Sequence, residues 1–121
     1  MNDHDTQVKV KICGMTNLKD VKVAVDGGVD AVGFIFYKKS PRSVTMQAVR
    51  KIVLELPPFV DSVGVFVNET AEQINKIADR CNLDRVQLHG NESPTFCKKI
   101  RRRVIKAIRV KDIQSLKKLS D

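Results

Sequence analysis

The sequence predicts an α/β fold in which strands and helices alternate along a parallel sheet. Three observations support this prediction: five short apolar runs of strand character, helical periodicity between them, and turn or cap residues at the junctions. The strand-like runs cover residues 8–13, 31–37, 62–67, 85–89 and 104–110. Because parallel strands are joined by right-handed crossovers, five such βα units predict one continuous parallel sheet.

Apolar residues recur at helical spacing between these runs, so each intervening segment is expected to bury one helix face. The stripes consist of Leu18, Val21, Ala24 and Val25 in the first segment, Met46, Val49, Ile52, Val53 and Leu56 in the second, and Ile74, Ile77, Ala78 and Cys81 in the third. Asn17 and Thr70 are expected to be N-terminal caps, and Ser93 is expected to begin a fourth helix. Asp112 is expected to cap a fifth helix.

Two architectures accommodate five βα units: an open doubly wound sheet, and a (β/α)8 barrel of which this chain would hold the first five units. An open sheet often has a glycine-rich phosphate loop after its first strand, but residues 13–16 (CGMT) match neither common form. Lys11 and Cys13 share one face of the first strand, and Gln87 and His89 share a face of the fourth. Strands covered by helices on both faces are apolar on both. Polar residues near the strand ends therefore favour a barrel with an active site at its mouth, the edge formed by the carboxyl ends of the strands.

Length and composition limit the class of protein. The 121 residues fit one domain, assigned to residues 1–121 with a polar leader at residues 1–7. The chain is 42% hydrophobic and 30% charged, which is typical of globular domains, and no apolar run approaches the roughly 18 residues of a membrane span. The leader lacks the apolar stretch of a secretory signal. These features predict a cytoplasmic protein without a membrane partner.

The cysteines and histidines do not form a metal-binding pattern. Cys13, Cys81 and Cys97 are odd in number and widely spaced, and His4 and His89 are isolated from each other. This distribution argues against both a disulfide framework and a metal site. Cys81 and Cys97 lie on apolar helix faces, so both are expected in the core.

The net charge of +8 suits an anionic partner such as a phosphate ester, a carboxylate or a nucleic acid. The densest basic run covers residues 98–103. We interpret it as the solvated end of a helix, with nucleic-acid contact as the alternative. The sequence has neither zinc-finger spacing nor interleaved aromatic residues on which bases could stack. No nucleic-acid partner is therefore expected.

Four side chains near the predicted strand ends are candidates for chemistry. Cys13 ends the first strand, where Lys11 and the following helix start would favour a thiolate. A small residue that fills a tight strand end explains Cys13 equally well. Arg42, in the loop after the second strand, offers a planar fork for a carboxylate or phosphate. Gln87 and His89 point to the same mouth, where His89 could act as an acid, donate a hydrogen bond or be structural.

Five segments together resemble the N-terminal part of the phosphoribosylanthranilate isomerase family, which are (β/α)8 barrels of tryptophan biosynthesis. These segments are KICGMT (11–16), AVGFIFYKKSPRSV (31–44), LPPFVDSVGVFVNE (56–69), VQLHGNE (86–92) and IKAIRV (105–110). They have the family's order and spacing over essentially the whole chain after the leader. The combination of KICG with VQLHG is the most specific part of the resemblance.

The resemblance implies an Amadori rearrangement of a small-molecule substrate without cofactor or metal. Phosphoribosylanthranilate would become 1-(2-carboxyphenylamino)-1-deoxyribulose 5-phosphate. A general acid opens the ribose ring to a Schiff base, and a general base removes the proton from the adjacent carbon. The family's base is the KICG cysteine, here Cys13, and its SPR arginine, here Arg42, holds the anthranilate carboxylate. Gln87 and His89 match positions that line the family's mouth.

The family's general acid is an aspartate at the end of the sixth strand, and its phosphate loops follow the seventh and eighth strands. The sequence reaches Asp121 in the fifth helical segment, so these three units are expected to be absent. Neither Asp112 nor Asp121 would lie in the mouth to replace the acid. The outer strands would expose unpaired backbone groups. We therefore expect the isolated polypeptide to have little or no isomerase activity and to form homo-oligomers, with a non-catalytic barrel fragment as the alternative function.

Overall fold

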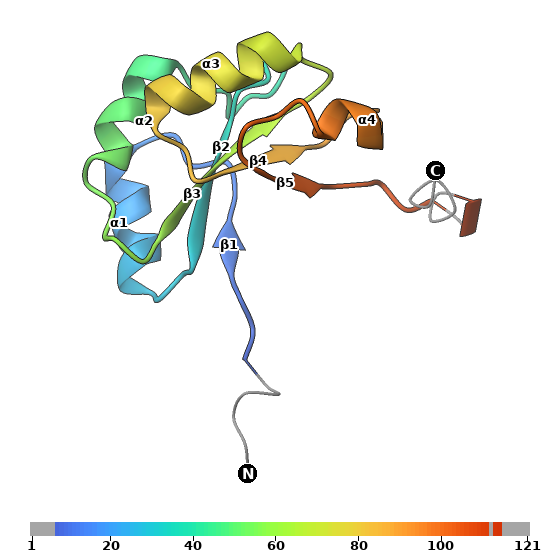
Figure 1. Ribbon diagram of the computed structural model, residues 1–121. Helices are drawn as coiled ribbons and strands as arrows, with labels where there is room; N and C mark the ends of the chain where they lie inside the picture. The colour runs from blue at the N-terminus through green and yellow to red at the C-terminus, as the bar shows by residue number, and fades with distance from the viewer. Residues whose placement is uncertain (1–6, 112, 115–121) are drawn as a thin grey trace.

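The computed structural model describes residues 7–111 and 113–114, which form alternating strands and helices (Figure 1). The elements are β1 (Lys11–Ile12), α1 (Leu18–Asp26), β2 (Ala31–Ile35), α2 (Met46–Val53), β3 (Asp61–Phe66), α3 (Ala71–Cys81), β4 (Arg85–Leu88), α4 (Pro94–Cys97) and β5 (Arg103–Lys106). All five predicted strands are present. The expected cap of a fifth helix, Asp112, lies outside the described residues, as do His4 and Asp121.

The five strands form one parallel sheet in the order β1-β2-β3-β4-β5, so neighbours in the chain are neighbours in the sheet. A doubly wound sheet instead reverses its strand order at a switch point. The described strands contain no such reversal, which excludes the doubly wound alternative. The order is that of consecutive units in a (β/α)8 barrel, as the strand faces predicted.

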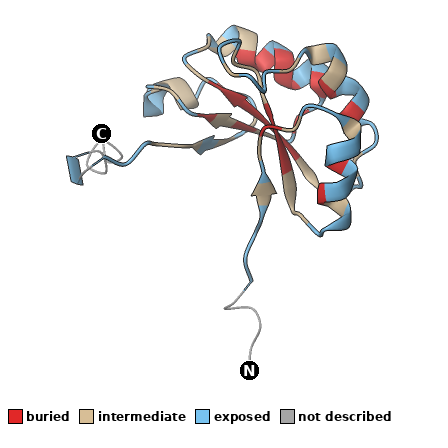
Figure 2. Ribbon diagram, turned by 180° about the vertical axis from the view of Figure 1, so that it is seen from behind, coloured by how far each residue is buried: buried red, intermediate tan, exposed pale blue. Residues whose placement is uncertain are grey.

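The hydrophobic core lies between the helices and one face of the sheet. The strands contribute alternate residues to it, including Val32, Phe34, Phe66, Val86 and Leu88, all fully buried. The helices contribute Val21 and Ala24 from α1, Val49 and Ile52 from α2, and Ile74, Ile77, Ala78 and Cys81 from α3. Figure 2 shows these buried positions along the central strands and on the helix sides that face them. The core position predicted for Cys81 is confirmed, and Cys97 packs half-buried against the same cluster.

Side-chain caps determine where the four described helices begin, and three of these caps were predicted from the sequence. Asn17, Thr70 and Ser93 each accept a hydrogen bond from the backbone N–H three residues ahead, at 2.8, 3.2 and 3.1 Å respectively. Helix α1 ends before Gly27, and the chain then turns through Gly28, whose φ is 88°. The predicted caps of these helices are confirmed.

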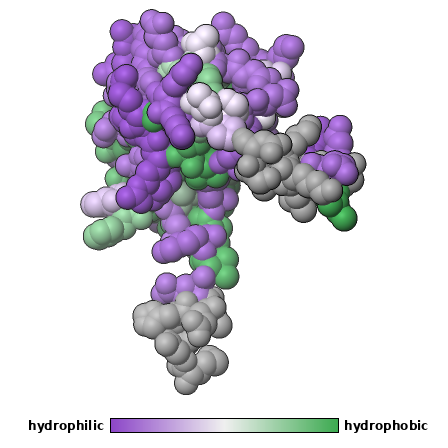
Figure 3. Space-filling model, turned by 45° about the vertical axis from the view of Figure 1, so that its right-hand side comes forward, coloured by the Kyte–Doolittle hydropathy of each residue, from purple (hydrophilic) through white to green (hydrophobic). Residues whose placement is uncertain are grey.

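The two outer strands of the described sheet are shorter than the sequence pattern predicted. The pattern extended over residues 8–13 and 104–110, whereas β1 and β5 span 11–12 and 103–106. An outer strand has a bonding partner on one side only. Its backbone can therefore stay extended beyond the last residue that is hydrogen-bonded to the neighbouring strand. Val8 and Val10, which precede β1, are 77% and 46% exposed, and Ile12 on β1 is 37% exposed. Figure 3 shows apolar surface (green) around the lower centre of the molecule, between the main body and the N-terminal segment.

The basic run at residues 98–103 binds α3 through two of its arginines. Arg102 pairs with Asp79 at 3.0 Å and donates to the carbonyl of Ala78, in the last turn of α3, at 3.3 Å. Arg101 also pairs with Asp79, and its hydrogen bond is the main cause that lowers the pKa of the Asp79 carboxyl below 3.8. The interpretation of this run as a solvated helix end is therefore wrong for Arg102, whose side chain is 24% exposed.

Candidate active site

Cys13 follows β1 at the carboxyl end of the strand, and its side chain lies over Gly33 of β2. A Cβ atom at Gly33 would stand 3.0 Å from Cys13 Sγ and 3.2 Å from Lys11 Nζ. The thiol and the ammonium therefore share the inner face of the sheet, which is the face opposite the helical core. This placement confirms the predicted phase of the first strand. A larger residue at Gly33 would displace the thiol.

Arg42 crosses the β1–α1 loop beside Cys13. Its Nη1 donates a hydrogen bond to the Cys13 carbonyl oxygen at 3.5 Å. Gly14, which has a φ of 79°, makes this approach possible, since a Cβ atom there would stand 2.7 Å from Arg42 Cζ. The loop that carries Arg42 is held near the strand end because Val44 N donates to the Ile35 carbonyl at 3.0 Å. Cys13, Lys11 and Arg42 thus come together at the mouth.

Gln87 and His89 lie on the same inner face, farther along the sheet. Gln87 is in register with Val65 of β3 and Ile105 of β5, and its Oε1 is buried without a partner among the described residues. His89 is exposed just after β4, and its N–H donates to the Phe66 carbonyl at 3.0 Å. Three strand spacings of about 4.8 Å place β4 on the order of 14 Å from β1. These two side chains are therefore separated from Cys13 by the width of β2 and β3.

A buried carboxylate at the ends of β4 and β5 was not predicted from the sequence. The Glu92 side chain is 3% exposed and accepts a hydrogen bond from Lys106 Nζ at 2.8 Å. It also accepts from the backbone N–H groups of Asn68 and Gly90, each at 2.9 Å. Burial raises the pKa of Glu92, but hydrogen bonds from Lys106 and backbone amides outweigh it and lower the pKa below 4.5. We call these four residues the Glu92 cluster.

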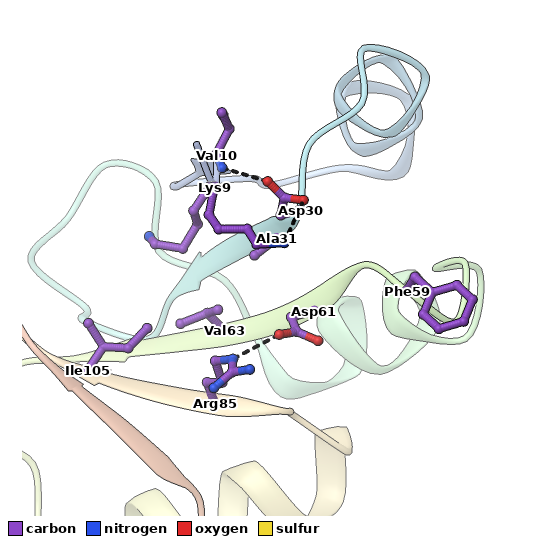
Figure 4. Close-up of a pocket in the computed structure, with 10 residues that line it drawn as sticks. Lys9, Val10, Asp30, Ala31, Phe59, Asp61, Val63, Arg85 and Ile105 are labelled. Atoms are coloured by element: carbon purple, nitrogen blue, oxygen red, sulfur yellow. Dashed lines mark hydrogen bonds and ion pairs between the residues drawn. The ribbon is translucent and has the colours of Figure 1, made fainter. Parts of the chain in front are cut away.

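The inner face also carries a cavity of about 430 Å³ near the amino ends of the strands (Figure 4). It is lined by Lys9, Val10, Lys11, Asp30, Ala31, Phe59, Asp61, Val63, Arg85 and Ile105. Arg85 Nε donates to Asp61 Oδ2 at 2.8 Å and Val10 N donates to Asp30 Oδ2 at 2.8 Å. The lining includes Lys11 but none of Cys13, Arg42 and His89, so this hollow meets the candidate site at Lys11.

Within the described ranges, no three side chains of His, Cys, Asp or Glu are placed to hold a metal ion. In the same part of the chain, no helix has the length and apolar character needed to cross a membrane. Cys13, Cys81 and Cys97 are free thiols.

The consecutive parallel βα units, with polar side chains gathered at the carboxyl ends of the strands, define the class as (β/α)8-barrel proteins. Comparison with known proteins then identifies the family. Residues 10–121 match the model of the N-(5'-phosphoribosyl)anthranilate (PRA) isomerase family. The chain belongs to this family, as the resemblance of its segments implied.

Individual relatives agree with this assignment. The N-(5'-phosphoribosyl)anthranilate isomerase of Pelobacter propionicus is 55% identical over 113 residues, which cover 93% of this chain and 54% of the relative. That of Geobacter sulfurreducens is 56% identical over 109 residues, covering 90% and 54%. The crystal structure of phosphoribosyl anthranilate isomerase from Thermotoga maritima superposes with a TM-score of 0.91 at 49% identity, covering 93% of this chain and 56% of that one. The chain thus spans about half the length of the curated relatives it matches.

A second solved structure shows a relative with a ligand bound. It is a phosphoribosyl anthranilate isomerase in complex with reduced 1-(o-carboxyphenylamino)-1-deoxyribulose 5-phosphate. It matches with a TM-score of 0.91 at 49% identity, covering 93% of this chain and 59% of that chain.

Proposed function

We propose that this chain provides the first five βα units of a PRA isomerase of tryptophan biosynthesis, including the general base and the carboxylate-binding arginine of an Amadori rearrangement. The observation that carries the proposal is the position of Cys13 beside Arg42 at the strand ends, in the KICG and SPR segments of a chain that belongs to this family. Because the chain spans about half of its relatives, turnover would also need their remaining units.

The proposed reaction is acid–base chemistry without a cofactor. After a general acid has opened the ribose to a protonated Schiff base, the Cys13 thiolate takes the proton from C2 of the sugar. The electron pair of that C–H bond forms the C1–C2 double bond of an enol-amine, and the iminium nitrogen accepts the displaced pair. Protonation at C1 and loss of the enol proton then give the aminoketose. Lys11, over the same glycine as Cys13, would stabilise the thiolate.

The remaining site residues have proposed roles in binding. Arg42 presents an exposed guanidinium next to Cys13, where it would hold the anthranilate carboxylate through two parallel hydrogen bonds. Gln87 and His89 would line the opposite side of the mouth. The buried Oε1 of Gln87 lacks a partner within the described ranges, so it could accept a hydrogen bond from a substrate hydroxyl.

The test is a fusion of this chain to the region of the Pelobacter propionicus relative that lies beyond the match. The product would be measured by chromatography for the wild-type fusion, Cys13→Ser, Cys13→Ala and the control Cys97→Ser. We expect both Cys13 variants to lose roughly 10²- to 10⁴-fold in turnover, the range typical for a general base, with unchanged circular dichroism. Cys97→Ser should retain turnover. A near-normal rate in Cys13→Ala would exclude Cys13 as the base.

For the 121-residue polypeptide alone, we propose little or no isomerase activity and homo-oligomers formed through the outer strands. The support is the exposed apolar side chains of Val8, Val10 and Ile12 along β1 and the segment before it, and the edges of β1 and β5 that have no partner strand within the described sheet. Light scattering should show a mass above the monomer that falls on dilution, and Val10→Lys should shift it toward the monomer. A wild-type monomer at all concentrations would refute the proposed oligomers. Robust turnover by the isolated chain would refute the proposed lack of activity.

As for other biosynthetic enzymes with free thiols, we propose a cytoplasmic location.

A further inference from the structure

The Glu92 cluster joins three segments that are distant in the chain. Asn68 follows β3, Gly90 follows β4 and Lys106 ends β5, and all three donate to the same carboxylate at 2.9, 2.9 and 2.8 Å. Lys106 Nζ also donates to the Gly90 carbonyl at 2.6 Å. One buried side chain thus links the carboxyl ends of three neighbouring strands at the mouth.

Close packing within the cluster restricts its geometry further. A Cβ atom on Gly90 would stand 2.7 Å from Asn68 Cγ and 2.9 Å from Asn68 N, so this approach requires glycine. Asn68 has a φ of 51°, and its Oδ1 accepts a hydrogen bond from Asn91 N at 2.8 Å. Left-handed backbone is unfavourable for most residues and is tolerated by Asn. The loops after β3 and β4 are therefore held against each other by sterics as well as by hydrogen bonds.

The backbone is held on both sides of His89, on one side by the sheet and on the other by the cluster. The His89 N–H donates to the Phe66 carbonyl at 3.0 Å, and the next N–H in the chain, that of Gly90, donates to Glu92 at 2.9 Å. Both peptide groups that flank the His89 side chain are consequently fixed. A buried carboxylate carries a large desolvation cost, which two backbone N–H groups and one ammonium offset here. These directional hydrogen bonds fix the orientation of the peptide groups beside His89, which apolar packing alone would not do.

We propose that Glu92 is a positioning residue of the mouth, and that it orients His89 by accepting hydrogen bonds from the Gly90 and Asn68 amides and from the Lys106 ammonium. Glu92 touches no candidate reactive group, so its effect on the reaction passes through His89. The part of this inference that concerns turnover rests on the proposed isomerase function, whereas the part that concerns loop geometry does not.

The loop geometry is tested in the 121-residue chain by amide hydrogen exchange of Glu92→Gln. Exchange at Asn68 and Gly90 should accelerate roughly tenfold or more, because hydrogen bonds to charged acceptors are the stronger ones. The core amide of Val86 should keep its rate. The control is Glu69→Gln, since Glu69 lies near the same loop and its Oε1 accepts only from the adjacent Thr70 N–H among its recorded hydrogen bonds. Unchanged exchange at Asn68 and Gly90 would overturn the proposal.

A second variant covers the possibility that Glu92→Gln loses protection throughout the chain. Lys106→Gln leaves the carboxylate with its two backbone donors, and we expect a smaller acceleration confined to Asn68 and Gly90. If Lys106→Gln changes no exchange rate at these amides, or loosens Val86 equally, the proposal fails.

Turnover is tested in the fusion protein through a double-mutant cycle with His89→Ala. We expect Glu92→Gln to lower kcat about tenfold in the wild-type background and less than twofold in the His89→Ala background, since coupled residues are non-additive. A purely structural role would lower kcat equally in both backgrounds, and that result would overturn the proposal. An inactive wild-type fusion would count against the proposed function, while the exchange experiment would still decide the role of Glu92 in the loops.

Discussion

The two sides of the mouth are held in very different ways. On the side of β1 and β2, Cys13 and Arg42 are joined by one hydrogen bond of 3.5 Å, and the guanidinium is exposed. On the side of β3 to β5, the Glu92 side chain is 3% exposed and accepts three hydrogen bonds of 2.8–2.9 Å. Cys13 and Arg42 thus follow β1 and β2 at one edge of the described sheet, and the Glu92 cluster joins the ends of β3, β4 and β5.

This difference follows from the position of each strand. β4 has bonded neighbours on both sides, so the loops after β3 and β4 and the end of β5 can close around one carboxylate. β1 has β2 alone as a neighbour within the described sheet, and its contribution to the site depends on contacts with Gly33 and Arg42. The mouth is therefore more firmly bonded beside β4 than beside β1.

The largest effect should come from removing the apolar support of the firm side. Phe66 is fully buried, its ring stacks on that of Phe36 with centroids 5.3 Å apart, and its carbonyl binds His89 N–H. We expect Phe66→Ala to lower the free energy of unfolding by about 3–5 kcal/mol, as measured by urea denaturation. Phe59 is 95% exposed, so Phe59→Ala should change it by less than about 0.5 kcal/mol. If Phe66→Ala lowered the free energy of unfolding by less than about 1 kcal/mol, the apolar packing under this side of the mouth would not be what holds it.

The next effect concerns the charge of Glu92 and depends on pH. Because the pKa of Glu92 in the folded chain lies below its ordinary value of 4.5, the ionised carboxylate stabilises the fold fully above that value, and this contribution is lost as the pH falls through the folded-state pKa. Glu92→Gln should be less stable than wild type by about 1.5–3 kcal/mol at pH 7, the usual value of a hydrogen bond to a charged group. The gap should narrow steadily toward pH 3. Thermal unfolding across this range measures it, and a gap of constant size would show that the charge is not responsible.

Sequence patterns anticipated the fold well because the signals are local. Asn17, Thr70 and Ser93 were expected to cap helices, and each accepts the expected hydrogen bond. The alternation in the first strand correctly placed Lys11 and Cys13 on one face. Strand length was overestimated at both edges because alternation reports extended backbone and not the presence of a bonding partner.

The Glu92 cluster could not be found in the same way. Its members are separated by 24 residues between Asn68 and Glu92 and by 14 between Glu92 and Lys106. No local period connects them, and a glutamate after a strand is usually exposed. The available signal was the position of Glu92 in VQLHGNE and of Lys106 in IKAIRV, two segments that already carried the family resemblance. The resemblance therefore pointed to the right segments without identifying which residues are buried.

The smallest predicted effect tests whether the exposed side of the mouth contributes mainly to binding. In the fusion protein, Arg42→Lys keeps a positive charge but loses the planar fork that can bind a carboxylate through two hydrogen bonds. The anthranilate carboxylate does not change during the rearrangement, so its contacts should be equally strong in the ground and transition states. We expect KM to rise about tenfold, equivalent to about 1.4 kcal/mol, with kcat nearly constant.

Lys38→Gln is the matched control for this variant, since Lys38 is an exposed cation in the same loop. It should leave both constants unchanged if the guanidinium beside Cys13, rather than the general positive charge of the loop, binds the carboxylate. If Arg42→Lys instead lowered kcat at constant KM, Arg42 would act in the transition state. The loosely bonded side of the mouth would then resemble the firm side in orienting reacting groups, because its single hydrogen bond to the Cys13 carbonyl would contribute to placing the thiol.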